Sequence, residues 1–133
     1  MTIKRIETNE APRAIGPYSQ GVTVASIGGQ QLLFVSGMLP VNPTLGKMVE
    51  GDIKMLTRQV IMNLQAVLKE AGSHLQQVVR TDVFLLDLKG DFAGMNEEYA
   101  VWFNGPVAPA RQTIQVAALP MGARIEISCI ALA

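Results

Sequence analysis

The side chains best suited to chemistry in this sequence begin with an arginine near its C-terminal end. Arg111 opens a β-prone stretch directly after Pro109 and Ala110, and the proline restrains the backbone on its approach. A guanidinium held at a strand start can bind a carboxylate through two parallel hydrogen bonds. Because side chains alternate along a strand, Arg111 and Thr113 should share one face. The alternative is that Arg111 only forms a structural ion pair.

Glu126 is the second candidate, because it lies between the apolar residues Ile125 and Ile127. Burial of a carboxyl group raises its pKa and suits it to handling a proton near neutral pH. Two other interpretations stay open. Glu126 could face solvent on its strand, or it could pair with Arg111 or Arg124, of which Arg124 lies on the same alternating face.

Four further residues could line a ligand site. Tyr18 lies in an irregular segment, where its ring could wall a pocket and its hydroxyl could bind a ligand. Ser36 ends a predicted strand before Gly37, where the backbone can come close to a ligand. Asn96 lies early in a predicted helix and could point into a groove. Each polar side chain has a structural alternative: covering the core edge (Tyr18), stabilising a turn (Ser36) or facing solvent (Asn96).

Several common kinds of catalytic site are excluded by what the sequence lacks. Its only histidine is His74, and its only cysteine, Cys129, lies in an apolar alternation. Nothing near His74 supports a Ser-His-Asp triad, and a His/Cys zinc site cannot reach three ligands. No phosphate-binding glycine loop or dinucleotide fingerprint is present. An enzyme built on this chain must use carboxylate, guanidinium, hydroxyl and backbone groups, which suit attack of water on an already electrophilic carbon.

The composition bounds the class of protein. Lys plus Arg number 11, as do Asp plus Glu, so the formal net charge is zero, which counts against a nucleic-acid partner. Hydrophobic residues make up 49% and charged residues 17%, whereas roughly 25% is typical for charged residues. We interpret this excess as apolar surface that is buried between copies of the chain.

Length indicates the number of domains, and the cysteine content and apolar segments indicate the compartment. The length fits one domain over residues 1–133. A single cysteine excludes an internal disulfide, and neither a signal-peptide core nor a membrane-spanning apolar run is present. These features predict a soluble protein of the reducing cytoplasm with no membrane partner.

Patterns along the chain predict an α+β fold. Apolar residues recur at three- and four-residue steps over 53–71, which predicts an amphipathic helix ended by Gly72. A second helix is predicted from an Asp91 cap to about Phe103. Strands are predicted at 3–6, 21–25, 31–36, 78–86, 111–118 and 123–131. This order favours one mixed sheet with two helices packed on one face.

The motifs occur in an order that resembles the reactive intermediate deaminase family, the RidA or YjgF-like proteins, formerly called L-PSP endoribonucleases. The resemblance runs almost end to end and includes AIGPYSQ (14–20), VSGMLP (35–40), PAR (109–111) and IEI (125–127). It implies a chorismate-mutase-like (YjgF-like) fold with a six-stranded mixed sheet. It also implies a homotrimer whose sheets face inward, with active sites in clefts between neighbouring subunits.

The resemblance also implies a role for each matching position, and it implies neither a metal nor an organic cofactor. Arg111 would bind the substrate carboxylate, and Glu126 would orient or activate the attacking water. The pocket would be lined by Tyr18 and flanked by Ser36, Gly37 and Asn96.

Two positions depart from the family pattern. Thr113 stands where many deaminase-active members have cysteine, and Met38 stands where glutamine often follows Ser-Gly. A residue at position 113 need not be a nucleophile if its backbone carbonyl holds the water. The change to Thr113 therefore predicts an altered substrate preference more than inactivity, and Met38 predicts an altered pocket shape.

The implied reaction is hydrolysis of 2-aminoacrylate-type enamines and their 2-imino acid tautomers to 2-keto acids and ammonia, as in a 2-iminobutanoate/2-iminopropanoate deaminase. Its ligands would be small imino and keto acids that carry a carboxylate. Two rival functions stay open: a regulator that senses 2-keto acids without turnover, and an RNA-directed ribonuclease or translation inhibitor. The zero net charge and the 5% aromatic content count against the RNA function.

Overall fold

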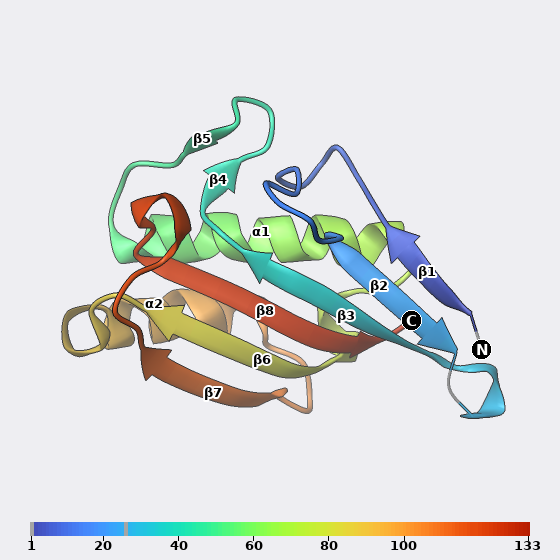
Figure 1. The fold of residues 1–133 in the computed structure, drawn as a ribbon. Helices are drawn as coiled ribbons and strands as arrows, with labels where there is room; N and C mark the ends of the chain where they lie inside the picture. Colours follow the sequence, from blue (N-terminus) through green and yellow to red (C-terminus); the bar gives the residue numbers. More distant parts are fainter. Residues whose placement is uncertain (1, 26) are drawn as a thin grey trace.

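The chain folds around a six-stranded sheet (Figure 1). A computed structural model describes residues 2–25 and 27–133. Every neighbouring strand pair is antiparallel except β6 with β7, which is parallel. The predicted mixed sheet is therefore confirmed. In spatial order its strands are β1 (Ile3–Ile6), β2 (Gly21–Ala25), β3 (Gln31–Met38), β8 (Ile125–Leu132), β6 (Val78–Leu85) and β7 (Ala110–Gln115).

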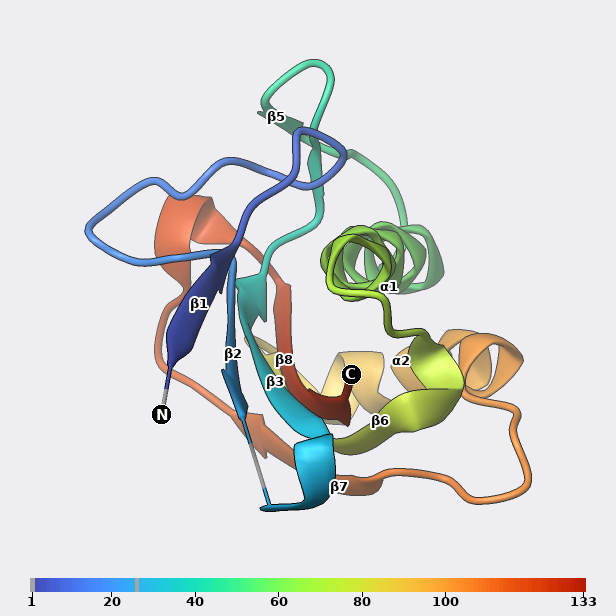
Figure 2. The same cartoon turned by 90° about the vertical axis from the view of Figure 1, so that its right-hand side faces the viewer.

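Both helices pack on one side of this sheet, as the sequence predicts (Figure 2). Helix α1 (Ile53–Glu70) begins at Asp52, whose side chain accepts a hydrogen bond from the Met55 amide at 2.9 Å. It ends where Gly72 adopts a positive φ of 78°, a conformation that suits glycine. Helix α2 (Leu88–Trp102) packs against α1 and β6.

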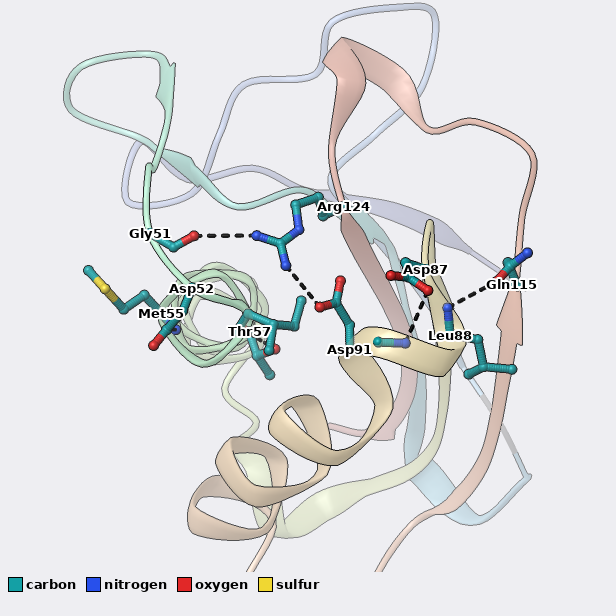
Figure 3. Close-up of polar contacts among 11 residues, drawn as sticks. Gly51, Asp52, Met55, Thr57, Asp87, Leu88, Asp91, Gln115 and Arg124 are labelled. Atoms are coloured by element: carbon teal, nitrogen blue, oxygen red, sulfur yellow. Dashed lines mark hydrogen bonds and ion pairs between the residues drawn. The ribbon is translucent and has the colours of Figure 1, made fainter.

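The predicted cap of the second helix is wrong. Asp87, not Asp91, is the N-cap of α2, and its carboxylate accepts a hydrogen bond from the Gly90 amide at 3.0 Å (Figure 3). Asp91 lies in the first turn, is buried, and pairs with Arg124 at 2.8 Å. Either aspartate could cap a helix here. Arg124, directly before β8, compensates the burial of Asp91 and leaves Asp87 as the cap.

Four predicted strands differ from the observed ones at their ends. β6 ends one residue earlier, at Leu85, and β8 spans Ile125–Leu132 rather than 123–131. β3 continues through Gly37 to Met38, and β7 ends at Gln115 rather than at residue 118. The early end of β7 has a simple cause, because β7 pairs only with β6, and the register runs out at Leu85 opposite Gln115.

The core lies between the sheet and the helices. The inner face of α1 contributes Val60, Leu64 and Val67, which are fully buried. They belong to one cluster with the inward side chains of β3, β6 and β8, among them Leu33 and Ile127. Alternation along β8 separates these inward residues from the partly exposed ones that face the other way.

A short hairpin of β4 (Val41–Asn42) and β5 (Lys47–Met48) stands beside the main sheet. Asn63, buried within α1, donates hydrogen bonds of 2.9 Å to the carbonyls of Leu39 and Val41. Because both carbonyls belong to the segment that leaves β3, this amide fixes where the hairpin begins.

The sheet face away from the helices, called the open face below, carries exposed apolar side chains. Phe34 is 42% exposed and Ile114 is 38% exposed. Register places Phe34 beside Val22 on β2 and Ile130 on β8. The open face thus presents apolar side chains next to the exposed ion pair between Arg80 and Asp82, and no other described segment of a single copy forms a layer over it.

The described helices include none that is both long enough and apolar enough to cross a membrane.

Candidate functional site

A cleft of about 360 Å³ lies on the open face, at the end of the sheet where β3 leaves for the hairpin. Tyr18 from the segment before β2, Ser36 and Gly37 from β3, and Glu126 from β8 line it. These four residues were singled out in the sequence on separate grounds, and the fold brings them together.

The Glu126 carboxyl packs directly against the backbone of Gly37. A Cβ atom at position 37 would lie 2.7 Å from Glu126 Cδ and 2.8 Å from its Oε2, so a glycine is needed here. The register between β3 and β8 shifts between Val35 and Met38, and such irregularities re-aim side chains. Within the described residues the carboxyl has no hydrogen-bond or ion-pair partner. Burial raises the pKa of Glu126, as predicted.

Hydrogen bonds to the backbone hold the Tyr18 side of the cleft. The Tyr18 hydroxyl accepts a hydrogen bond from the Ile15 amide at 3.1 Å. The Ser36 hydroxyl donates to the Ser19 carbonyl at 2.5 Å and so ties β3 to the segment that carries Tyr18. Both hydroxyl oxygens keep hydrogen-bonding capacity for a ligand, since a hydroxyl can donate once and accept twice.

Gln20 is a supporting residue that the sequence analysis missed. Its buried side chain accepts from the Thr8 amide at 2.7 Å and donates to the Pro12 carbonyl at 2.7 Å. These bonds fold residues 8–12 back against β2, next to the Tyr18 segment. A long polar side chain directly before an apolar strand was the available signal, but it does not reveal burial.

Arg111 lies on the other side of the sheet, against α2. Its guanidinium carbon is 4.8 Å from the centre of the Tyr99 ring and 5.9 Å from that of Phe92. Tyr99 is itself held by a 2.7 Å hydrogen bond between its hydroxyl and that of Thr81. Stacking holds a guanidinium through its face and leaves its N–H edge for an anion. No ion pair involves Arg111 within residues 2–25 and 27–133.

Thr113 and Asn96 lie on the Arg111 side. The Thr113 hydroxyl is buried and has no hydrogen-bond partner in the described chain, an uncommon condition for a buried polar atom. Asn96 is half-buried. It stands four residues after Phe92 and three before Tyr99, so it shares their helix face.

Strand register places the Glu126 cleft and the Arg111 group, which also includes Thr113 and Asn96, on opposite sides of the sheet. Arg111 lies beside Thr81 on β6, and Thr113 beside Val83, and both partners face the core. Glu126 lies beside Phe84, whose side chain points to the open face. Paired residues share a face of a sheet, so Arg111 and Glu126 point to opposite sides. Neither of the ion pairs proposed for Glu126 forms, because Arg124 binds Asp91 instead.

Polar contacts hold the start of α2, the helix that carries Phe92 and Tyr99, against β7 and the residue before β8 (Figure 3). Arg124, directly before β8, donates hydrogen bonds to Asp91 at 2.8 Å and to the Gly51 carbonyl at 3.5 Å. From β7, the Gln115 side-chain oxygen accepts from the Leu88 amide at 3.1 Å. These contacts fix the rings that stack on Arg111 relative to β7.

No group of His, Cys, Asp and Glu able to hold a metal ion occurs among the residues described. His74 is exposed, with its Nδ1 3.1 Å from Gln76 Oε1. Burial raises the pKa of Cys129 to about 12, so this thiol is a poor nucleophile. Cys129 lies beside Thr81 on the core side of the sheet.

Comparison with known proteins gives consistent matches along the chain. The family model described as Endoribonuclease L-PSP matches residues 8–133. Protein DfrA of Myxococcus xanthus is 46% identical over 99% of this chain and 97% of its own. The 2-iminobutanoate/2-iminopropanoate deaminase of Mus musculus is 43% identical over 97% of this chain and 90% of its own.

Solved structures agree with these matches. The structure of E. coli TdcF with bound serine superposes with a TM-score of 0.87, at 38% identity, covering 98% of both chains. Sequence and fold thus lead to one group of proteins, and this chain belongs to the reactive intermediate deaminase family, the RidA or YjgF-like proteins, whose family model is described as Endoribonuclease L-PSP.

Proposed function

We propose that this protein hydrolyses small 2-imino acids and their enamine tautomers to 2-keto acids and ammonia. Arg111 binds the substrate carboxylate, and water attacks the imine carbon. Glu126 takes a proton from that water as the C–O bond forms and passes it to the nitrogen. The new hydroxyl group then gives up its proton, which reaches the nitrogen through solvent, and the C=O bond forms as the C–N bond breaks and ammonia leaves. The carrying observation is that the guanidinium and the carboxyl both lack an ion-pair partner in the described chain, although Glu126 is half-buried.

The proposal requires two copies of the chain for each site. Since Arg111 and Glu126 point to opposite faces of their own sheet, the Arg111 group of one copy must meet the Glu126 group of its neighbour. This is a heterologous contact, in which two different surfaces of the chain meet, and such contacts usually close into a ring. We infer a homotrimer, and the exposed apolar side chains of the open face supply a surface that association would bury.

The remaining residues would position the substrate. Tyr18 and Ser36 present hydroxyl groups beside Glu126, and Gly37 gives the backbone close access. On the Arg111 side, the unpartnered Thr113 hydroxyl would accept or donate a hydrogen bond to bound water or substrate, and Asn96 would border the entrance. The intrinsic barrier of imine hydrolysis is low, so positioning and moderate acid–base assistance suffice.

The names of relatives support this proposal. The mouse relative is called a 2-iminobutanoate/2-iminopropanoate deaminase, and the TdcF structure contains serine, a small amino acid with a carboxylate. The free, buried Cys129 is compatible with the reducing cytoplasm as the site of action.

The test is release of ammonia and keto acid from imines made in situ by an amino-acid oxidase. Semicarbazide traps any free imine, so an active protein lowers semicarbazone formation in proportion to its concentration. Absence of any effect with all imines, at protein concentrations that exceed the oxidase, would refute the proposal. Binding of 2-keto acids without turnover would instead favour the metabolite-sensing function.

A further inference from the structure

A second hollow, called the side pocket here, adjoins the Glu126 cleft. Its volume is about 240 Å³, and it shares Ile15, Tyr18, Gly37 and Leu39 with that cleft. The rest of its wall is predominantly apolar and includes Pro12, Met38, Val41, Pro43 and Met121. The Tyr18 ring borders both spaces, so a ligand held beside Glu126 can extend along this ring into the side pocket.

The walls of the side pocket are held in place by the fold. Leu39 and Val41 are buried in a small cluster with Ala123. Their carbonyls are fixed by the hydrogen bonds from Asn63 in α1. A preformed apolar hollow of this kind binds apolar groups without the cost of ordering its walls.

Met121 borders the side pocket in a conformation that needs explanation. Its φ is 59°, and it is the one residue other than glycine with a positive φ in the described chain. A long side chain rarely occupies this region, and such residues gather at ligand sites. Here the turn Pro120–Gly122 carries an exposed thioether to the rim of an apolar hollow.

From these contacts we propose that the side pocket binds the side chain of the substrate. The preferred substrates are then 2-imino acids with an extended apolar side chain, such as those formed by oxidation of leucine, methionine or phenylalanine. A cavity of about 150 Å³ lined by apolar residues can hold benzene, so the side pocket is large enough for these groups. A methyl or ethyl group would leave most of it unfilled.

One cation, Arg13, lines the side pocket. It is exposed and makes no ion pair in the described part of the chain, so it remains hydrated at the mouth. An acidic substrate side chain inside the apolar pocket would be too far from Arg13 to pair with it. Imines derived from aspartate and glutamate should therefore be poor substrates.

This inference rests on the proposed function. Two measurements distinguish a failure of the side-pocket inference from a failure of the proposed hydrolysis. Imines of alanine, leucine, methionine and aspartate are generated by oxidases, and kcat/KM is obtained from competition with semicarbazide. The leucine imine should be preferred over the alanine imine at least about tenfold. Calorimetry with 4-methyl-2-oxopentanoate and with pyruvate should give a similar ratio of Kd values, and it applies even if no imine is hydrolysed.

Met121→Asn tests the side pocket itself, because asparagine tolerates positive φ but is polar. The leucine-to-alanine ratio should fall at least about fivefold. Leu45→Asn is the matched control, because Leu45 is exposed on the β4–β5 hairpin, which also borders the pocket through Pro43 and Gly46, but does not itself line it; it should keep the wild-type ratio. Equal kcat/KM values for all chain lengths, equal Kd values, or an unchanged ratio in Met121→Asn would overturn the inference, as would a preference for the aspartate imine.

Discussion

The Arg111 guanidinium and the Glu126 carboxyl point to opposite faces of one sheet, although only β6 lies between their strands. Both groups lack an ion-pair partner within the described residues. A single copy therefore holds two separate halves of the proposed site. The same geometry makes the dependence on a neighbouring copy open to a direct genetic test.

Mixing two inactive variants should restore activity. Arg111→Ala removes one half of each site and Glu126→Gln removes the other. In a ring of three, every mixed trimer contains one interface with both residues intact, so mixed trimers isolated by both tags should have roughly one third of the wild-type activity, and an unselected random mixture roughly one quarter. The measurement is imine hydrolysis by co-expressed, doubly tagged protein.

Each variant alone is the control for this experiment, and light scattering gives the size of the mixed assembly. No recovery in verified mixed trimers would mean that each site uses residues of one chain only. A monomer mass at micromolar concentration would exclude the shared site altogether.

Replacement of Arg111 should impair recognition of the carboxylate. Both Arg111→Ala and Arg111→Lys should lower kcat/KM at least about 100-fold, or roughly 2.7 kcal/mol, because lysine keeps the charge but loses the planar fork. Arg58→Ala is a matched control, since Arg58 pairs with Glu98 at 3.3 Å between the helices. That control should affect the melting temperature more than activity, and a folded Arg111→Ala protein with near-normal kcat/KM would refute the assigned role.

A methyl group at position 37 should displace the Glu126 carboxyl. The added Cβ would come within 2.8 Å of Oε2, and a displacement of about 1 Å can cost about 100-fold in rate. We expect such a loss for Gly37→Ala with only about 1 kcal/mol of destabilisation. In Gly105→Ala the new Cβ meets only the flexible Gln76 side chain, at 3.3 Å, so this control should keep its activity. Equal kinetics in the two variants would show that the contact is unimportant.

Local sequence pattern predicted much of the fold, and pairing between strands decided the rest. The periodicity of α1 and the shared face of Arg111 and Thr113 followed from spacing alone, and both are confirmed. Alternation orders residues within one strand but does not say which face meets the helices. That choice depends on the register of Phe84 beside Glu126, which no local pattern encodes. The burial of Gln20 was missed for the same reason.

Acidity should affect the stability of the wild type and of Glu126→Gln differently. Burial raises the pKa of Glu126, so the folded chain holds this proton more tightly than the unfolded chain does. The stabilisation from protonated Glu126 is complete below the ordinary pKa and is lost as the pH rises through the raised pKa. Glutamine has no such dependence, so Glu126→Gln should gain stability relative to wild type as the pH rises from 4 to 7. Urea unfolding at both pH values measures this; a relative loss at pH 7 would show that Arg111 of the neighbouring copy, which the proposed site brings to Glu126, outweighs the effect of burial on the pKa of Glu126.

Thr113 offers a test that separates a ligand-directed hydroxyl from a structural one. Its buried hydroxyl has no partner within the described chain, and an unsatisfied group of this kind costs roughly 1–3 kcal/mol. Thr113→Val keeps the shape and removes the hydroxyl, so the unfolding free energy should rise by about 1 kcal/mol while kcat/KM falls.

Thr113→Cys completes this comparison, because it retains the backbone carbonyl and a small polar side chain. It should keep kcat/KM within about tenfold of wild type, a barrier change of no more than about 1.4 kcal/mol, while shifting the preference among imines. Denaturant unfolding and kinetics on the same preparations decide between the roles. A less stable or dissociated Thr113→Val would assign the hydroxyl to the contact between copies. A strong gain of activity in Thr113→Cys over a nearly inert wild type would mean that threonine marks a protein that binds its ligand without hydrolysing it.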